Sequence, residues 1–178
     1  MSSANMKQDK TVILRPAKAS EAEAIHALMT EVYEELPDKD IYSCDDLENV
    51  KHYLNDAGFG VVGINKDGRI VSSLICQYPG TNDDNLGLDV GLSEEELLRV
   101  VHFESAVVHR DYRGQGLEGR MIAFAEERID KERYNIFFGT VSPDNPASCH
   151  TAEKNGFEYL ITKEKYGGLI RRIYCKRV

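Results

Sequence analysis

Residues 107–120, VVHRDYRGQGLEGR, form the segment best suited to binding an anion, because three glycines stand between a strand-like run and a helix-like run. A loop of this kind offers backbone N–H groups and a helix N-terminus to a charged group such as a pyrophosphate. Glycine-bearing connectors between strands and helices are also common where no phosphate binds. The loop by itself is therefore compatible with anion binding or with a plain turn.

Two known phosphate-binding patterns can be compared with this loop. Gly114, Gly116 and Gly119 satisfy the G-x-G-x-x-G spacing of dinucleotide-binding proteins. That fingerprint belongs near the first strand of its fold, whereas this loop lies two-thirds of the way along the chain. The P-loop pattern is absent, because no Lys-Ser or Lys-Thr follows the glycines. A dinucleotide-binding oxidoreductase stays open as an alternative that would require NAD, and not CoA, to stabilise the protein.

The loop and a second segment downstream together resemble the GNAT-type N-acetyltransferases. Arg113, Gly116 and the strand before them are similar to the R-x-x-G-x-G/A acetyl-CoA loop of that family. Residues 139–157, GTVSPDNPASCHTAEKNGF, are similar to its N-x-x-A-x-x-L-Y-x-K-x-G-F segment, with matching positions at Asn145, Lys154, Gly156 and Phe157. The two matches come in the family's order, with one helix and one strand between them. The resemblance therefore implies a GNAT fold.

The resemblance implies acetyl-CoA as co-substrate, bound where the fourth and fifth strands separate. Its pantetheine arm would pair with the backbone of the fourth strand, and its pyrophosphate would lie on the glycine loop, where the helix dipole stabilises negative charge. A Cβ at Gly116 would stand between the backbone and the phosphate. The residues implied for this site are Ala106, Val107, Val108, Arg113, Gly114, Gln115, Gly116, Leu117, Gly119, Asn145 and Ser148.

The reaction implied is transfer of an acetyl group to a primary amine, and a neutral amine requires a base to take its proton. His102 and Glu104 alternate along the fourth strand and share one face with Ala106. Family members often use a Glu on this strand. Counting from the loop favours His102, but Glu104 has the matching chemistry, so we predict Glu104 as the base and His102 as the second choice. A solvated strand residue or an ion pair is the competing interpretation for each.

Two departures from the family pattern bear on the mechanism. Where the family places a Tyr that protonates the leaving thiolate, this chain has Ala152, and no neighbouring candidate matches by position; those candidates are Cys149, His150, Tyr159 and Tyr166. We expect water to supply that proton. Where the family places Gly or Ala, this chain has Glu118, which we expect to face solvent from the first turn of its helix. These departures favour the alternative of a non-catalytic acyl-CoA-binding sensor or regulatory module.

Charged segments flank the predicted site. Residues 81–99 carry six acids and one base, which would concentrate cationic acceptors or merely form a solvated loop. The basic residues near the C-terminus would neutralise CoA phosphates or protect an edge strand from aggregation; they are Lys163, Lys165, Arg171, Arg172, Lys176 and Arg177. We predict a small-molecule amine as acceptor, because the chain carries no extra recognition domain. An aminoglycoside-like drug, an amino acid, and a protein N-terminus or lysine stay open as acceptors.

Length and composition limit the remaining possibilities. The 178 residues predict one domain spanning 1–178, with residues 1–10 flexible. A formal net charge of -8 argues against a nucleic-acid partner. The four cysteines lie far apart with no C-x-x-C, so we expect no metal site, no disulfide framework and a cytoplasmic protein. No apolar run is long enough for a membrane span. The partners we expect are acetyl-CoA and an amine acceptor, and a homodimer is left open.

The hydrophobic patterns predict an α/β fold with a mixed central sheet of six to seven strands flanked by about four helices. Ser20 with Glu23 should open the first helix, and Ser43 should precede the second. Asp67-Gly68 should turn a hairpin, Ser93 with Glu96 should open a short helix, and Asn145 should cap the helix that Pro146 begins. The predicted strands are 12–15, 59–64, 70–77, 100–108, 136–141, 158–162 and 169–175, and a helix is predicted at 117–130.

Overall fold

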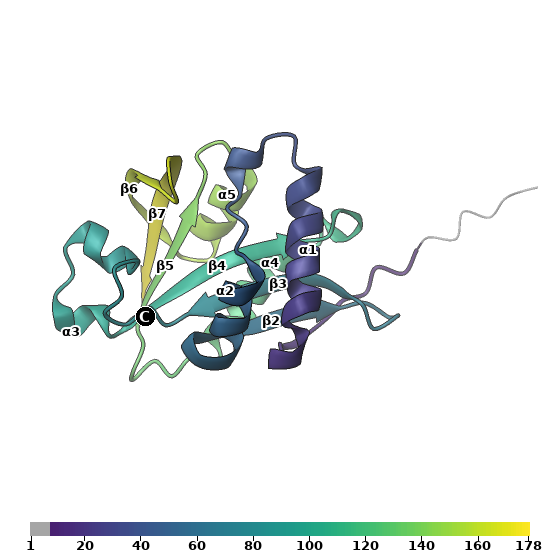
Figure 1. Ribbon diagram of the computed structural model, residues 1–178, viewed down its shortest axis with the longest axis horizontal. Helices are drawn as coiled ribbons and strands as arrows, with labels where there is room; N and C mark the ends of the chain where they lie inside the picture. Colours follow the sequence, from purple (N-terminus) through teal and green to yellow (C-terminus); the bar gives the residue numbers. More distant parts are fainter. Residues whose placement is uncertain (1–7) are drawn as a thin grey trace, which may run out of the picture.

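A mixed seven-stranded sheet forms the centre of the computed structural model, which describes residues 8–178 (Figure 1). The strand order is β1-β2-β3-β4-β5-β7-β6, and neighbours are antiparallel except for the parallel pair β4 and β5. This agrees with the predicted six to seven strands. We predict that residues 1–10 are flexible, and residues 1–7 of this segment lie outside the described part of the chain. The strands are β1 Ile13–Pro16, β2 Gly58–Ile64, β3 Ile70–Gln77, β4 Val100–Val108, β5 Ile136–Val141, β6 Glu158–Lys165 and β7 Leu169–Arg177.

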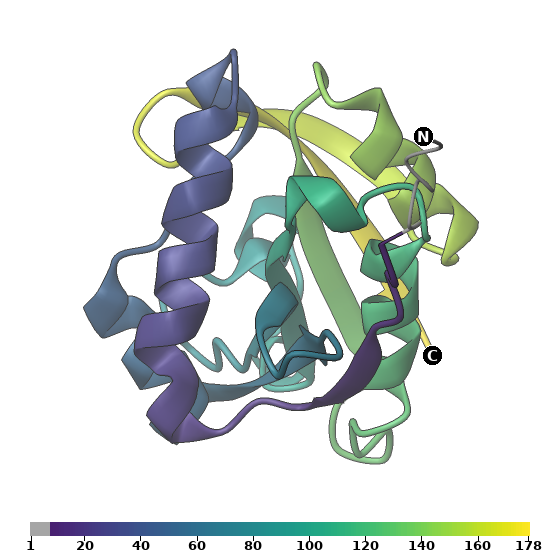
Figure 2. The same ribbon diagram turned by 90° about the vertical axis from the view of Figure 1, so that its right-hand side faces the viewer.

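Helices cover both faces of the sheet. Figure 2 shows α1 on one side of the strands and α4 with α5 on the other. The fold has five α-helices within residues 8–178, one more than the approximate prediction, because the short α3 is also helical. Their bounds are α1 Ala22–Glu35, α2 Leu47–His52, α3 Glu94–Leu97, α4 Leu117–Glu126 and α5 Pro146–Lys154.

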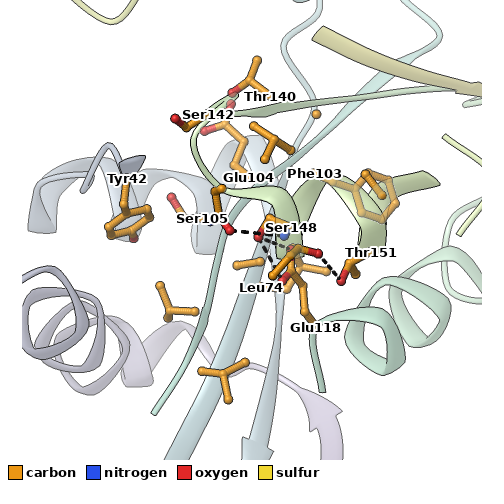
Figure 3. Close-up of a pocket in the computed structure, with 18 of the residues that line it drawn as sticks. Tyr42, Leu74, Phe103, Glu104, Ser105, Glu118, Thr140, Ser142, Ser148 and Thr151 are labelled. Atoms are coloured by element: carbon orange, nitrogen blue, oxygen red, sulfur yellow. Dashed lines mark hydrogen bonds between the residues drawn. The ribbon is translucent and has the colours of Figure 1, made fainter. Parts of the chain in front are cut away.

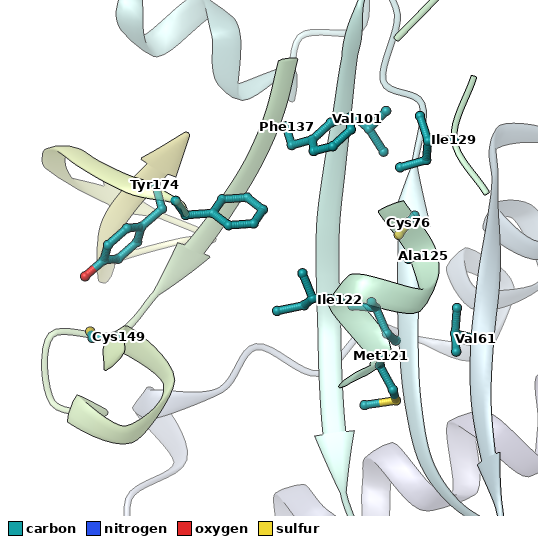
Figure 4. Close-up of a cluster of buried hydrophobic side chains, with 12 residues drawn as sticks. Val61, Cys76, Val101, Met121, Ile122, Ala125, Ile129, Phe137, Cys149 and Tyr174 are labelled. Carbon is teal, nitrogen blue, oxygen red and sulfur yellow. The ribbon is translucent and has the colours of Figure 1, made fainter. Parts of the chain in front are cut away.

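The alternation of strand side chains produces a separate core on each face of the sheet. Val62 packs with apolar residues of α1 and α2, whereas its neighbour Val61 packs with α4. Figure 4 shows the second of these clusters, in which Met121 and Ala125 of α4 lie over the sheet. Both α4 side chains are fully buried. This packing fixes the position of α4, and with it the glycine loop at its N-terminus.

Several predicted helix and turn signals are confirmed. The N–H of Ser93 donates to Glu96 Oε2 at 3.1 Å, and the N–H of Glu96 donates to Ser93 Oγ at 3.2 Å, which completes the capping box. Asn145 Oδ1 accepts the N–H of Ser148 at 3.2 Å, with Pro146 at the first helical position. Gly68 has the positive φ, 79°, that its hairpin turn requires.

Two predicted helix starts are wrong by a few residues. Ser20 lies in the 3-10 turn Ala19–Glu21, and α1 begins after it, because the Glu21 carboxylate accepts from the N–H of Lys18 at 2.8 Å and pairs with Arg15. Asp46, not Ser43, caps α2 by accepting the N–H of Asn49 at 2.8 Å. At α2 a nearby carboxylate supplies the acceptor in place of the predicted serine, whereas Glu21 makes no side-chain cap hydrogen bond to α1.

The parallel pairing of β4 with β5 is short. Only Val100, Val101 and His102 pair with residues of β5. The pairing of β4 with β3 then skips a residue, because Glu104 opposes Ile75 while Val107 opposes Ser73. At this bulge Ser105 has a φ of 34°, a backbone conformation that L-residues rarely adopt. Beyond His102, the edge of β4 that faces β5 is therefore left without a strand partner.

The burial of Met121 yields the first prediction. Met121→Ala should lower the free energy of unfolding by about 2–5 kcal/mol, because it leaves a cavity in the cluster that anchors α4. Chemical denaturation monitored by circular dichroism measures the change. Leu98→Ala, at a side chain that is 55% exposed, is the control and should cost much less. Equal losses in the two variants would contradict the packing described here.

Candidate functional site

A cavity of about 610 Å³ opens where β4 and β5 separate. Its walls come from β4, the glycine loop, the end of β5, α5, the connection from α1 to α2, and the turn between β6 and β7. Figure 3 shows side chains from several of these elements, including Tyr42, Glu104, Glu118 and Ser148, around the same space. The cavity thus joins the glycine loop to the strand that carries the candidate bases.

The glycine loop is built to receive an anion. Gly114 and Gly116 have φ values of 81° and 66°, and a Cβ on either would meet no atom within 4 Å. The first intrahelical bond of α4 runs from the N–H of Arg120 to Gly116 O at 3.0 Å, so the preceding N–H groups point out of the helix end. Tyr112 and Leu117 are buried on either side and hold the loop in place. Space, free donors and a helix N-terminus coincide here, as a pyrophosphate would require.

Nine of the eleven residues predicted for the cofactor line the cavity. They are Ala106, Val107, Val108, Arg113, Gly114, Gly116, Leu117, Asn145 and Ser148. The other two lie outside its lining. Gln115 donates through Nε2 to Tyr112 O at 3.3 Å, and Gly119 faces α5, where a Cβ would come within 3.1 Å of Asn155 Nδ2. Gly119 therefore permits close packing of two helices.

Glu118 does not face solvent, so that prediction is wrong. Its carboxylate lines the cavity, and Ser148 Oγ lies 3.3 Å from each of its oxygens as a hydrogen-bond donor. Burial raises the pKa of Glu118 to about 7, against the lowering effect of the Ser148 hydrogen bond. Glu118 is the second residue of α4 and faces α5. There the hydroxyl of Ser148 donates to its carboxylate, a partner that the local sequence does not reveal.

The neighbours of His102 fix the tautomer of its neutral ring. Its side chain is 1% exposed, and its Nε2 accepts the N–H of Leu86 at 3.0 Å. The proton of the neutral ring must therefore be on Nδ1. Nδ1 lies 3.1 Å from Gln77 Oε1 and 3.2 Å from Glu104 Oε1. His102 thus donates toward the carboxylate of Glu104, and its one lone pair is already used.

Glu104 lies at the cavity with part of its carboxylate accessible. Its side chain is 21% exposed and lines the cavity next to the bulge. The hydrogen bond from His102 orients one oxygen. The structure thus brings both predicted bases together, with the imidazole behind the carboxylate.

Sequence reasoning missed several polar residues of the cavity. Asp45 accepts a hydrogen bond of 2.5 Å from Ser105 Oγ, and burial raises the pKa of Asp45 to about 6, assisted by the charge of Glu104. The hydroxyl of Tyr42 is buried, and among residues 8–178 it has no hydrogen-bond partner. These residues lie on the connection between α1 and α2. No local motif marks them, because only the fold brings that connection to β4.

Of the four candidate proton donors, Tyr166 is the one that lines the cavity. Its hydroxyl lies 2.9 Å from Thr140 Oγ1, and burial together with the charge of Glu104 raises its pKa to about 12. Tyr159 instead bonds Thr162 on the exposed β6, and Cys149 is buried against Ser142 O. His150 is exposed.

The charged segments at either end of the sheet pair with one another. Asp89 forms ion pairs with Lys163 and Lys165 at 3.1 and 2.8 Å, and Glu96 pairs with Arg177 at 3.2 Å. The acids of residues 81–99 do not line the cavity. β6, which carries both lysines, is an edge strand. The structure thus favours the structural interpretation of these charges, apart from Arg171, which is buried at the cavity.

The family model for the acetyltransferase (GNAT) family matches residues 22–157. The chain belongs to the GNAT acetyltransferase family. Its predicted resemblance and fold class are thereby confirmed, and the family assignment disfavours the oxidoreductase alternative. No curated protein matches the chain by sequence.

Solved GNAT structures share this fold at low sequence identity. The GNAT acetyltransferase from Streptococcus pneumoniae is 17% identical with a TM-score of 0.70, covering 94% of this chain and 100% of that one. NAA60 from Arabidopsis thaliana in complex with acetyl-CoA is 9% identical with a TM-score of 0.75, covering 94% and 99%. The protein yncA from Salmonella typhimurium, with its cofactor acetyl-CoA, is 13% identical with a TM-score of 0.69, covering 94% of each chain. Two of these three structures were thus solved with acetyl-CoA, the co-substrate that we expect for this GNAT protein. Across residues 8–178, no helix is both long and apolar enough to span a bilayer.

The raised pKa of Glu118 predicts a pH dependence of stability. Between pH 4.5 and about 7 the folded protein keeps a proton that the unfolded chain has lost, so the free energy of unfolding falls as pH rises. Asp45, with its pKa raised to about 6, adds a slope of the same sign at lower pH. Glu118→Gln should remove the Glu118 part of the slope, so that the loss of stability between pH 5 and pH 8 becomes smaller by on the order of 1–3 kcal/mol.

Urea denaturation at a series of pH values measures this effect. Glu127→Gln, at an exposed position near the other end of the same helix, is the control and should leave the slope unchanged. If Glu118→Gln gives the same profile as the unmutated protein, the carboxylate is not buried as described.

Proposed function

We propose that this GNAT protein transfers the acetyl group of acetyl-CoA to the nitrogen of a primary amine carried by a small molecule. The observation that carries the proposal is the continuity of one cavity from the glycine loop to the Glu104 carboxylate. An anion site and a general base would thus lie at two ends of one space, which is the arrangement that positioning two substrates requires. The α1–α2 connection and the β6–β7 turn line the part of the cavity where we place a compact acceptor.

The CoA end of the cavity uses backbone groups in this proposal. Acetyl-CoA supplies the activated acetyl group as a thioester. The N–H groups at residues 114–118 bind its pyrophosphate, and Arg113 adds a positive charge beside them. The unpaired edge of β4 at Ala106 and Val108 offers backbone partners to the pantetheine arm. Side-chain identity matters little along that edge.

Glu104 is the base in this proposal, and His102 is its positioning residue. The carboxylate reaches the cavity, whereas the imidazole is buried and its lone pair is occupied by the N–H of Leu86. The Nδ1–H of His102 orients the carboxylate by donating to it. Tyr166 keeps its proton at neutral pH and can serve as a donor to the leaving thiolate beside water, since Ala152 offers none.

The direct test of the proposed function is release of free thiol from acetyl-CoA in the presence of a panel of amines. Turnover with at least one amine, with the acetyl group found on its nitrogen by mass spectrometry, is the expected result. If acetyl-CoA binds while no amine gives turnover, the protein is an acyl-CoA sensor. The presence of Ala152 where the family has a tyrosine would then account for the absence of turnover.

The open space at Gly116 predicts a selective loss of CoA affinity. Gly116→Ala and Gly68→Ala place the same Cβ at a positive φ with nothing within 4 Å, so their backbone strain should be similar. Gly116→Ala alone should weaken CoA binding, by about 10-fold or more, because its methyl group stands where a phosphate would approach. Isothermal titration calorimetry measures both affinities. An equal affinity in the two variants would place the pyrophosphate elsewhere.

The arrangement of the bases predicts two different kinetic effects. Glu104→Gln should lower kcat by about 100-fold or more with acetyl-CoA affinity retained, because the base is lost. His102→Asn should lower kcat less, because the donor that orients the carboxylate is removed while the carboxylate itself remains.

Steady-state kinetics at a series of pH values separate these roles. Glu94→Gln, at an exposed acid of α3, is the control and should behave as the unmutated protein. If His102→Asn abolishes turnover while Glu104→Gln keeps it, the assignment of base and positioning residue is reversed.

A further inference from the structure

Arg171, on β7, is a buried cation at the cavity. Arg171 is 3% exposed, yet it lines the same cavity as Glu104. Its guanidinium donates through Nη1 to Ile170 O at 2.9 Å and through Nη2 to Asp40 O at 2.7 Å. Both of these acceptors are backbone carbonyls. Among residues 8–178 no carboxylate forms an ion pair with it, unlike the neighbouring basic residues Lys163, Lys165 and Arg177.

A buried guanidinium without an ion-pair partner is costly, and burial lowers the pKa of Arg171 against the raising effect of Tyr166, Asp40 and Asp38, which act from beyond ion-pair distance. The two carbonyls use two of its five N–H donors, so the others remain for a ligand. Guanidinium groups match the geometry of a carboxylate, with which they form two parallel hydrogen bonds. An acceptor that brings a carboxylate would therefore supply the directly paired anion that no carboxylate of residues 8–178 provides.

The cation and the base lie in the same part of the cavity. The hydroxyl of Tyr166 feels the charge of Glu104, which raises its pKa, and the charge of Arg171, which lowers it. Asp45 raises this pKa too, and its carboxylate accepts from the hydroxyl of Ser105, the residue after Glu104, so two acids and one cation line the same space. A space lined by both signs suits a zwitterion. A diamine, by contrast, would place its second ammonium group against Arg171.

We propose that the acceptor is an amine that also carries a carboxylate, as amino acids do, with Arg171 binding the carboxylate while the amine lies at Glu104. This inference rests on the proposed acetyl transfer and narrows its substrate class. It also gives Arg171 a role other than neutralising CoA phosphates. The cationic acceptors that an acidic rim would attract are disfavoured.

Matched pairs of acceptors test the inference. The pairs are glycine with methylamine, β-alanine with ethylamine, γ-aminobutyrate with propylamine, and lysine with 1,5-diaminopentane. The carboxylate-bearing member of at least one pair should have a kcat/KM higher by about 100-fold, the scale for a buried charge pair. The pair with the largest ratio reports the spacing between Arg171 and the reacting nitrogen. Equal rates within every pair, or a preference for the diamine, would overturn the inference.

Variants of β7 supply the controls. Arg171→Gln should abolish the preference with acetyl-CoA affinity unchanged, and Arg171→Lys should retain part of it because the charge remains. Arg172→Gln, at the next residue, whose side chain lies over the exposed ring of Tyr159, should keep the full preference. A preference that survives Arg171→Gln would mean that Arg171 only ties β7 to the carbonyl of Asp40.

Calorimetry with the same amino acids, in the presence of CoA, separates this inference from the proposed function. If no amine is acetylated but an amino acid binds and Arg171→Gln removes that binding, the acetyl transfer is wrong and the carboxylate site stands. If acetylation occurs without any carboxylate preference, the transfer stands and the carboxylate site is wrong. If neither binding nor transfer is seen, both are wrong.

Discussion

The short pairing of β4 with β5 is the constraint on which the site depends. These are parallel neighbours that share only three residue pairs, after which the edge of β4 loses its partner. Unpaired backbone groups inside a protein need other partners, because leaving them unsatisfied is costly. The bulge at Ser105 bends β4 at this point. The gap is thus a place where the sheet itself provides hydrogen-bonding groups to a ligand.

The packing on the two faces of the sheet keeps this gap open. Phe103 contacts Phe137 and Phe157, with ring centroids 5.2 and 5.6 Å apart, so the two strands stay in register up to the point of separation. On one face α4 is anchored by Met121 and presents its N-terminus to the gap. On the other, the connection after α1 brings Asp45 to the bulge. Each core therefore fixes one side of the cavity.

Local signals in the sequence predicted most of the fold. Apolar runs located all seven strands. The cap at Asn145 and the turn at Gly68 were confirmed because each depends only on residues nearby in the sequence. The start of α2 was wrong because a neighbouring carboxylate outcompeted the predicted serine, and that of α1 was wrong because Ser20 lies in the 3-10 turn before it. The short α3 was confirmed by its capping box.

The glycine loop was predictable as a motif, but the rest of the site depends on distant partners. Glu118 lies inside because Ser148, 30 residues further on, donates to it. His102 is turned toward Glu104 because its other nitrogen is taken by the N–H of Leu86. Arg171 lies near the C-terminus and lines the cavity. In the sequence nothing distinguishes it from the other basic residues of that segment. Such contacts follow from the sheet order, which no local pattern encodes.

A crystal structure of the protein with acetyl-CoA tests the central claim most directly. The account predicts a pyrophosphate on the N–H groups of residues 114–118, a pantetheine arm along the edge of β4 from Ala106 to Val108, and the thioester beside the bulge at Ser105, facing Glu104. Acetyl-CoA bound outside the gap between β4 and β5, or bound with its thioester away from Glu104, would contradict it.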